Sequence, residues 1–368
     1  MTEKDMLFYI HETKEKVAPI ISDSEKIAHD AVAGFTAHKP ERVILVASGT
    51  SFNSTLAVRL FFEKMTQLPV STIPSYNYAH YETVFLPGDI VFAISQEGES
   101  TNTLAALEKA QEKGVPVISV TENLRTSQRN TIAQKGDYVL DILCGKEEVG
   151  PKTKGYIATV LTLQMAALEI GKATGKVTET EAIDLKEQAQ KTVANFPNVI
   201  VASLEWFDAN ERDLAKLEKG VVVGYGSNFA NAIEGGLKAL ETVRYPFSSF
   251  EVEEFLHGPL AMIRSDVYTF FVSPKSTGYE RINPLYKAMQ VQNKHCYSIG
   301  TQEGAIKDKR ILESDCFKNY EDFTVIEYII PLQIMAYKMY KAKDQELYIR
   351  EYPKTSDVLE TKTARFRK

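Results

Sequence analysis

The sequence predicts an α/β protein with two consecutive parallel sheets covered by helices. Short apolar runs rich in branched residues, such as Arg42–Ala47 and Asp89–Ile94, alternate with longer segments of helical periodicity. The order of strand, glycine- and serine-containing turn and helix begins again at Gly220. Strands that alternate with helices favour a parallel sheet buried on both faces, and the repeat indicates that the architecture is duplicated.

The elements follow from this alternation in order. Residues 1 to 35 are predicted to be helical, and a charged helix at 177–193 is expected to end at Phe196-Pro197-Asn198. We place the boundary between two domains there, at 1–196 and 197–368. Strands are expected at 42–47, 70–74, 89–94, 115–120 and 138–142, and again at 220–224, 266–272 and 296–300. Helices are expected at 53–65, 104–113, 153–171, 231–241 and 327–340.

Composition excludes several classes of function. The net charge of −6, without a block of lysine or arginine, does not favour nucleic acid as a partner. No apolar run approaches the roughly 20 residues of a membrane span, and the N-terminus lacks the apolar core of a signal peptide. Three cysteines without metal-ligand spacing favour a reducing, cytoplasmic location. We expect no metal and no other cofactor.

Two hydroxyl-rich loops follow expected strands and precede expected helices. They are Ser48-Gly49-Thr50-Ser51 and the stretch from Ser95 to Thr103. Helix N-termini favour anions, and hydroxyl groups can donate further hydrogen bonds to phosphate oxygens. Neither loop has the pattern of a nucleotide P-loop or a dinucleotide fingerprint, so a single phosphate on a small molecule fits best. Plain helix capping by serine and threonine remains the alternative.

A row of charges lies on the helix expected at 231–241. Glu234, Lys238 and Glu241 stand at i, i+4 and i+7 and therefore share one face. We expect the apolar stripe of Ile233, Leu237 and Leu240 to pack on the sheet, and the charged face to form the wall of a polar site. Glu241 is a candidate general base, and a solvated surface row is the alternative.

His257 follows Glu241 by sixteen residues, in the segment Glu254-Phe-Leu-His257-Gly-Pro. It is a candidate for the chemistry of the same site, although a lone histidine is often a structural residue. Glu254 and His257 also have the i, i+3 spacing of carboxylate metal sites, but such sites need a second copy of the motif, and the sequence contains none.

These motifs together resemble sugar isomerase (SIS) domains, in particular the isomerase half of the glutamine–fructose-6-phosphate aminotransferases. The resemblance rests on Ser48–Ser51, Ser95–Ser100, Thr153-Lys154, Glu234–Glu241 and His257–Leu260 and covers nearly the whole chain. It implies two tandem SIS domains, each a parallel sheet flanked by helices in a flavodoxin-like three-layer arrangement.

The resemblance also implies residue roles. Glu241 resembles the base that moves a proton between C1 and C2 of the open-chain sugar, supported by Glu234. Lys238 resembles a lysine that handles the nitrogen-bearing intermediate or orients the substrate. His257 resembles the ring-opening histidine, which reaches the site from the partner subunit and so implies a homodimer. Glu147 resembles the family's acidic pocket residue, and Lys362 resembles the tail lysine that covers the sugar. The residues that resemble the phosphate cradle are Ser51, Ser95, Gln96 and Ser100, with Thr50 nearby.

Two departures qualify these expectations. The chain begins about where the family's glutaminase domain would end, and no cysteine precedes Cys144, so we do not expect ammonia transfer from glutamine. Glu97 stands where the family usually has a serine, which is unfavourable beside a phosphate unless a cation such as Lys152 compensates. Otherwise Glu97 points away or contacts a cationic part of the substrate.

We therefore expect an enzyme acting on an aminated hexose 6-phosphate. Glutaminase-free relatives include fructosamine-6-phosphate deglycases and amino-sugar-6-phosphate deaminases or isomerases. A simple aldose–ketose phosphosugar isomerase and a non-catalytic phosphosugar sensor are the alternatives.

Overall fold

The computed structural model describes residues 4–122, 130–300, 308–347 and 358–363. The chain divides into two compact units. The β1–β5 unit comprises Glu15–Glu147, Lys154–Glu187 and Ile349–Lys368, and the β6–β10 unit comprises Met1–Lys14, Glu148–Thr153 and Gln188–Tyr348. The boundary expected at residue 196 stays a prediction.

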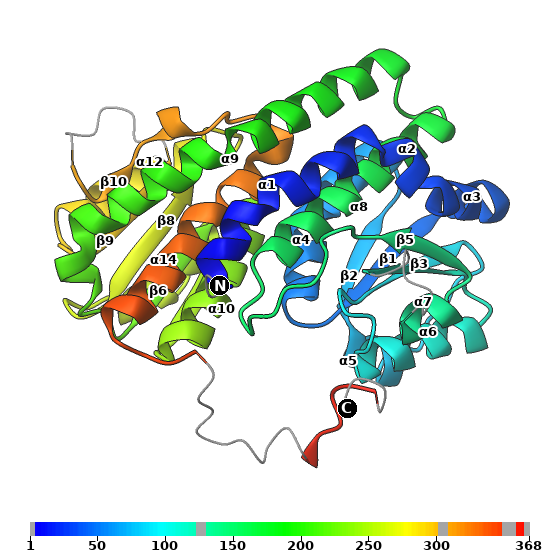
Figure 1. Cartoon of the computed structure of the whole chain (residues 1–368), viewed down its shortest axis with the longest axis horizontal. Helices are drawn as coiled ribbons and strands as arrows, with labels where there is room; N and C mark the ends of the chain where they lie inside the picture. The colour runs from blue at the N-terminus through cyan, green and yellow to red at the C-terminus, as the bar shows by residue number, and fades with distance from the viewer. Residues whose placement is uncertain (1–3, 123–129, 301–307, 348–357, 364–368) are drawn as a thin grey trace. The chain divides into compact units, whose positions relative to one another are not determined.

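The first sheet contains five parallel strands in the order β2-β1-β3-β4-β5 (Figure 1). They are β1 (Arg42–Ala47), β2 (Val70–Pro74), β3 (Asp89–Ile94), β4 (Val117–Thr121) and β5 (Tyr138–Asp141). All six residues of β3 are buried, as expected for a central strand covered on both faces. The α/β fold class predicted from the sequence is confirmed in this half.

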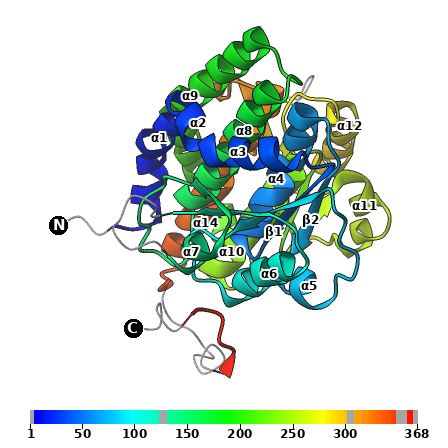
Figure 2. The same cartoon turned by 90° about the vertical axis from the view of Figure 1, so that its right-hand side faces the viewer.

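Helices cover both faces of the first sheet. On one face, Phe92 of β3 packs against Phe62 of α4 (Thr50–Thr66) and Phe35 of α3 (His29–His38), and α8 (Lys154–Ala173) packs against α4. The other face carries α5 (Ser75–His80), α6 (Thr101–Glu112) and α7 (Thr131–Lys135), and Figure 2 shows α5 and α6 side by side. Two helices, α1 (Met6–Ser22) and α2 (Ser24–Ile27), precede α3.

The second sheet repeats this topology. Its order is β10-β9-β8-β6-β7, which matches the first sheet when it is read from the other end. The strands are β6 (Gly220–Gly224), β7 (Phe247–Glu251), β8 (Tyr268–Ser273), β9 (Cys296–Gly300) and β10 (Ile311–Leu312). The two outermost strands, β7 and β10, were not predicted, because neither is a continuous buried apolar run. The duplication of architecture is confirmed.

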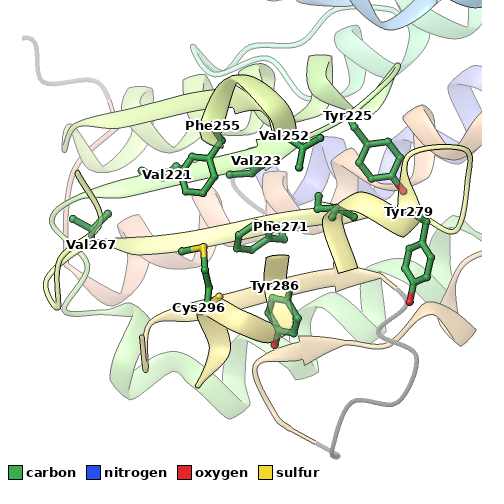
Figure 3. Packing of buried hydrophobic residues seen from close by; sticks show 12 residues of the cluster. Val221, Val223, Tyr225, Val252, Phe255, Val267, Phe271, Tyr279, Tyr286 and Cys296 are labelled. Carbon is green, nitrogen blue, oxygen red and sulfur yellow. The ribbon is translucent and has the colours of Figure 1, made fainter. Parts of the chain in front are cut away.

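A continuous apolar core lies on one face of the second sheet (Figure 3). Val221 and Val223 of β6 and Phe271 of β8 pack there against α11 (Val252–Leu256) and α12 (Tyr279–Gln290). The opposite face carries α10 (Asn228–Val243), which lies between the sheet and α14 (Ile329–Ala342). The short helix α13 (Thr324–Glu327) precedes α14, so the helix expected at 327–340 begins beyond a break at Tyr328.

The expected break at Phe196-Pro197-Asn198 is wrong. The helix α9 runs from Glu179 to Leu214 with Pro197 inside it. A proline within a helix costs about 3 kcal/mol, because it removes one backbone hydrogen bond and crowds the preceding turn. Here Phe196 and Val199, on either side of the proline, are at most 1% exposed, and burial of such side chains offsets a cost of this size.

None of the helices among the described residues combines the length and the hydropathy that a membrane-spanning helix needs.

Candidate active site

The first sheet has a change of direction between β1 and β3. These strands are neighbours, but the chain leaves β1 for β2 on one side and leaves β3 for β4 on the other. At such a point the two connections diverge and leave a crevice beyond the carboxyl ends of the strands, which is where open α/β sheets bind ligands. The two hydroxyl-rich loops both begin at this edge.

The first loop, residues 48–51, leads directly into α4. Gly49 is the N-cap residue, with φ of 60°, so the loop uses a conformation that favours glycine. Because glycine has no side chain, no side-chain hydrogen bond caps α4 among the described residues. The capping alternative therefore does not fit this loop. Thr50 and Ser51 lie half-buried in the first turn, where backbone N–H groups favour an anion.

The second loop, residues 95–100, is a tight turn that packs against Asn130. Gly98 N–H donates to the Ser95 carbonyl oxygen at 3.0 Å, and Gly98 has φ of 69°. A Cβ at Gly98 would lie 2.0 Å from Cγ of Asn130, so only glycine fits here. Ser100 accepts a hydrogen bond from Thr103 N–H at 3.5 Å and caps α6. For Ser100, capping and phosphate binding therefore both remain open.

Gln96 belongs to this loop, and its side chain lies against the start of α8. Its Nε2 donates to Sγ of Cys144 at 3.3 Å, and a Cβ at Gly155 would lie 2.1 Å from its Oε1. Burial raises the pKa of the Cys144 thiol well above its ordinary value, so the sulfur stays protonated. Gly155 and Cys144 thus fix the Gln96 amide, and the sequence analysis assigned neither of them a role.

Glu147 caps α8. Its carboxylate accepts hydrogen bonds from the N–H groups of Lys154 at 3.3 Å and Gly155 at 3.1 Å, and Glu147 is 4% exposed. A carboxylate at a helix N-terminus is stabilised by the macrodipole. Its expected role as an acidic pocket residue stays a prediction.

The end of the chain lies against the second loop. Ser100 and Lys362 form an antiparallel β-bridge, and Lys362 Nζ donates to Glu97 Oε2 at 2.9 Å. The tail lysine is therefore a cation that lies beside Glu97. Lys152, proposed above as the compensating cation, belongs to the other unit.

Glu99 is the second carboxylate of this loop, and sequence analysis assigned it no role. Its two oxygens accept from the N–H and hydroxyl groups of Thr131 at 3.0 and 2.7 Å. The hydroxyl of Thr363 donates to it as well, and Glu99 is 4% exposed. Glu99 therefore joins the loop to α7 and to the tail.

In the β6–β10 unit, α10 carries the predicted charged row. Lys238 Nζ lies 2.5 Å from Glu241 Oε2 and 3.4 Å from Glu234 Oε1. Glu234 and Lys238 are at most 1% exposed, whereas the Glu241 side chain is 35% exposed. The row is therefore a buried ion-pair network that opens to solvent at Glu241.

The expected packing of α10 on its apolar stripe is wrong. Leu240 is 45% exposed, and Ile233 and Leu237 are only partly buried. Instead the helix packs through Gly235 and Gly236, whose absent side chains admit close neighbours. A Cβ would lie 2.5 Å from Leu332 Cδ1 of α14 at Gly235, and 2.5 Å from the Ser249 hydroxyl of β7 at Gly236. The paired glycines were the signal for this face, because they allow a helix to approach its neighbours closely.

The two carboxylates of this network keep Lys238 charged. Burial by itself would lower the pKa of Lys238, but Glu234 and Glu241 outweigh it and raise the pKa above its ordinary value. Lys238 is therefore an ammonium group and a donor. Oε2 of Glu241 accepts a hydrogen bond from this ammonium group.

His257 is exposed, unlike the buried residues Glu234 and Lys238 of this network. It follows α11 as the C-cap residue, and its side chain is exposed. Glu254, also exposed, is on the same short helix. Among the described residues, no group of three or more histidine, cysteine, aspartate or glutamate side chains could hold a metal ion.

The corresponding edge of the second sheet is filled by a tyrosine. Tyr225 follows β6 as Ser48 follows β1, and it is 5% exposed. Its hydroxyl donates to the Pro274 carbonyl oxygen, and a Cβ at Gly278 would lie 2.2 Å from its ring. Figure 3 shows Tyr225 beside Tyr279 at this end of the core. The position that corresponds to the first hydroxyl-rich loop is therefore occupied by a buried tyrosine.

Comparisons with known proteins agree with this architecture. A family model described as SIS domain matches residues 37–169. The glutamine–fructose-6-phosphate aminotransferase [isomerizing] of Bradyrhizobium diazoefficiens is 26% identical over 89% of this chain and 54% of its own length. That of Pyrococcus horikoshii is 27% identical over 87% and 53%. The chain thus spans about half the length of the curated relatives it matches.

Solved structures show the same fold. A Clostridium difficile protein, named provisionally as a phosphosugar isomerase, has a TM-score of 0.86 at 22% identity and covers 97% of this chain and 99% of its own. The C-terminal domain of the Francisella tularensis glucosamine-fructose-6-phosphate aminotransferase has a TM-score of 0.80 at 21% identity. The match covers 93% of this chain and 97% of that domain. Glucosamine-6-phosphate deaminase from Thermotoga maritima has a TM-score of 0.68 at 19% identity, with coverage of 93% and 96%.

Proposed function

We propose that this chain, a SIS-domain protein with two tandem SIS domains, is a phosphosugar-processing enzyme that acts on an aminated hexose 6-phosphate. Its reaction would be that of a fructosamine-6-phosphate deglycase or an amino-sugar-6-phosphate deaminase or isomerase. The observation that carries the proposal is the buried row on α10, in which Lys238 holds the half-exposed carboxylate of Glu241.

Glu241 is the proposed base. In this chemistry a carboxylate removes the proton alpha to a carbonyl or imine carbon of the open-chain sugar and returns it to the neighbouring carbon. A base works best when it is ionised and fixed in orientation before the substrate arrives. Lys238 meets the second need, because its ammonium group holds one carboxylate oxygen of Glu241. We therefore assign Lys238 an orienting role and Glu234 the role of its second counter-ion.

The hydroxyl-rich loops are the proposed phosphate cradle. Thr50 and Ser51 lie in the first turn of α4, and Ser95, Gln96 and Ser100 surround a turn whose shape depends on Gly98. Both loops stand at the carboxyl edge of the first sheet, where the connections diverge. A phosphate dianion bound there would receive several N–H and O–H donors.

His257 is the proposed acid for ring opening or for protonation of the leaving nitrogen. An imidazole can donate or accept a proton near neutral pH. Because its side chain is exposed, His257 could enter the active site of a second copy of the chain. We propose a homodimer on this basis.

A substrate panel tests the proposal. The purified protein is incubated with 6-phosphorylated fructosamine adducts of several amino acids, with glucosamine 6-phosphate and with fructose 6-phosphate, and products are followed by mass spectrometry. Release of a hexose 6-phosphate and a free amine supports deglycase or deaminase chemistry. Interconversion of hexose 6-phosphates alone would establish the simple isomerase instead. Ligand-induced thermal stabilisation without conversion of any compound would contradict an enzymatic role.

A further inference from the structure

We propose that the negative charge of Glu97, in the proposed phosphate-binding loop, is neutralised by Lys362 of the tail so that a sugar phosphate can bind. The proposal rests on the proposed function for its ligand. It assigns Lys362 a role in preparing the loop, in addition to any contact with the sugar.

The backbone of the tail, and not the lysine alone, fixes it to the loop. Thr101 N–H donates to the Thr361 carbonyl oxygen at 3.2 Å, and Thr363 N–H donates to the Glu99 carbonyl oxygen at 3.0 Å. The Thr101 hydroxyl donates to the Glu360 carbonyl oxygen at 2.7 Å. These bonds hold residues 360–363 antiparallel to the loop around the Ser100–Lys362 bridge.

This pairing determines where the tail side chains lie. Directly opposed residues of an antiparallel pair have side chains on the same face, and neighbouring residues alternate. Lys362, opposite Ser100, is therefore on the face of the proposed phosphate ligand Ser100, and its Nζ reaches Glu97 at 2.9 Å. Thr363 lies on the other face, where its hydroxyl meets the buried carboxylate of Glu99.

The two carboxylates of the loop, Glu97 and Glu99, thus differ in exposure and in hydrogen-bond partners. Glu99 is 4% exposed and is committed to Thr131 and Thr363. Glu97 has a side chain that is 30% exposed, and its partner Lys362 is 37% exposed. A carboxylate in this position would repel a phosphate dianion, and the repulsion is strong at a few ångströms in a partly dehydrated loop. The lysine removes this repulsion by giving the Glu97–Lys362 pair no net charge.

The consequence is a loop whose affinity for phosphate depends on the tail. Without the Lys362 ammonium group, Glu97 would lose the charge of this lysine and would weaken phosphate binding even if the lysine never touched the ligand. Without both charges, the loop would resemble one with an uncharged residue at this position. Rescue of the lysine variant by a second substitution at Glu97 therefore distinguishes this role from a purely direct contact.

The experiment compares wild type with Lys362→Met, Glu97→Gln and the double variant. Glu108→Gln is the matched control, because Glu108 also pairs with a lysine, Lys135, at the surface of the same unit. Glucose 6-phosphate and inorganic phosphate are titrated into each protein by calorimetry at low and at high salt. In parallel, hydrogen exchange of the Thr101 and Thr363 amides is followed in the unliganded proteins.

We expect Lys362→Met to weaken glucose 6-phosphate binding by about tenfold or more at low salt. The double variant should bind only about threefold more weakly than wild type. Each single variant should exchange the two amides about two- to fivefold faster than wild type, as loss of a surface ion pair predicts, and the double variant no faster than the singles. Glu108→Gln should change neither measurement.

Two results would overturn the inference. A double variant that binds as weakly as Lys362→Met would make the lysine a ligand contact alone. Unchanged exchange in both single variants would show that Glu97 does not hold the tail. If wild type binds no sugar phosphate or phosphate, the proposed function fails, and the phosphate-binding role proposed for Glu97 fails with it. Exchange would then report only on the Glu97–Lys362 contact.

Discussion

Lys238 Nζ lies 2.5 Å from Glu241 Oε2 on α10, and the two residues differ sharply in exposure. The ammonium group is 1% exposed and the carboxylate side chain 35% exposed. A buried cation thus supports a carboxylate that solvent can reach. This relationship motivates the first two predictions.

Glu241→Gln should abolish turnover while sugar-phosphate binding survives. The amide keeps the shape of the side chain but cannot accept the proton, and loss of a general base typically lowers the rate by about 10² to 10⁴. Steady-state kinetics with the best substrate of the panel gives the rate, and calorimetry with glucose 6-phosphate gives the affinity. Turnover within about tenfold of wild type would show that another group is the base.

Lys238→Met should destabilise the β6–β10 unit, and more so at high pH. Removal of one partner from a buried ion pair typically costs about 3–5 kcal/mol, and here it leaves Glu234, which is fully buried, without this cation. In the variant the folded state would favour protonated carboxyl groups, so stability should fall as pH rises. Urea unfolding at pH 5 and pH 8 measures this. Lys135→Met, which breaks a half-exposed pair, should cost less than about 1 kcal/mol at both pH values.

Mixing two inactive variants tests whether His257 serves a partner subunit. In a homodimer with shared sites, Glu241→Gln and His257→Ala chains would form mixed dimers with one intact site each. About a quarter of the wild-type site number, and so about a quarter of the activity, should return after subunit exchange. Continued inactivity, with mixed dimers confirmed by mass spectrometry, would show that each chain uses its own histidine.

The central strands and the charged row were predictable because their signals are local. β1 and β3 are short apolar runs, and Glu234, Lys238 and Glu241 lie within eight residues. Edge strand β7 was missed because its five residues are all half-buried, so the sequence has no apolar run there. Burial of Lys238 was missed because patterns treat charged residues as exposed, although Gly235 and Gly236 marked a closely packed face.

Contacts between distant parts of the sequence could not be predicted. Glu97 was recognised as unfavourable beside a phosphate, but its partner Lys362 is 265 residues away. The resemblance had placed this lysine near the sugar, and only the bridge between Ser100 and Lys362 brings it to Glu97. Pro197 failed as a helix breaker for a related reason, since burial of Phe196 and Val199 depends on tertiary packing.

Gly235→Ala should lower stability, although alanine normally favours a helix by about 1 kcal/mol over glycine. The new methyl group would lie 2.5 Å from Leu332 Cδ1, and overpacking of this kind costs about 1–3 kcal/mol. Adding Leu332→Ala should recover part of the loss, because it makes room for the methyl group. Urea unfolding of the single and double variants measures both effects. A Gly235→Ala protein as stable as wild type would show that α10 and α14 can separate without cost.

Glu327 should make the β6–β10 unit less stable as pH rises towards 7. This carboxyl group is fully buried and accepts hydrogen bonds from the N–H groups of Lys318 and Asn319 at 2.9 and 2.8 Å. Burial outweighs these donors and raises its pKa from 4.5 to about 7. Between these values the folded protein holds a proton that the unfolded chain has released, so stability declines by about 3 kcal/mol in total and levels off above pH 7.

Urea unfolding at pH 5, 6, 7 and 8 measures this decline. Glu327→Gln cannot ionise, so its stability should lack that component of the pH dependence, whatever its absolute value. The exposed Glu112, changed to glutamine in the same way, should leave the wild-type profile unaltered. Parallel profiles for wild type and Glu327→Gln would mean that Glu327 titrates near its ordinary value, and that its two backbone donors compensate for burial.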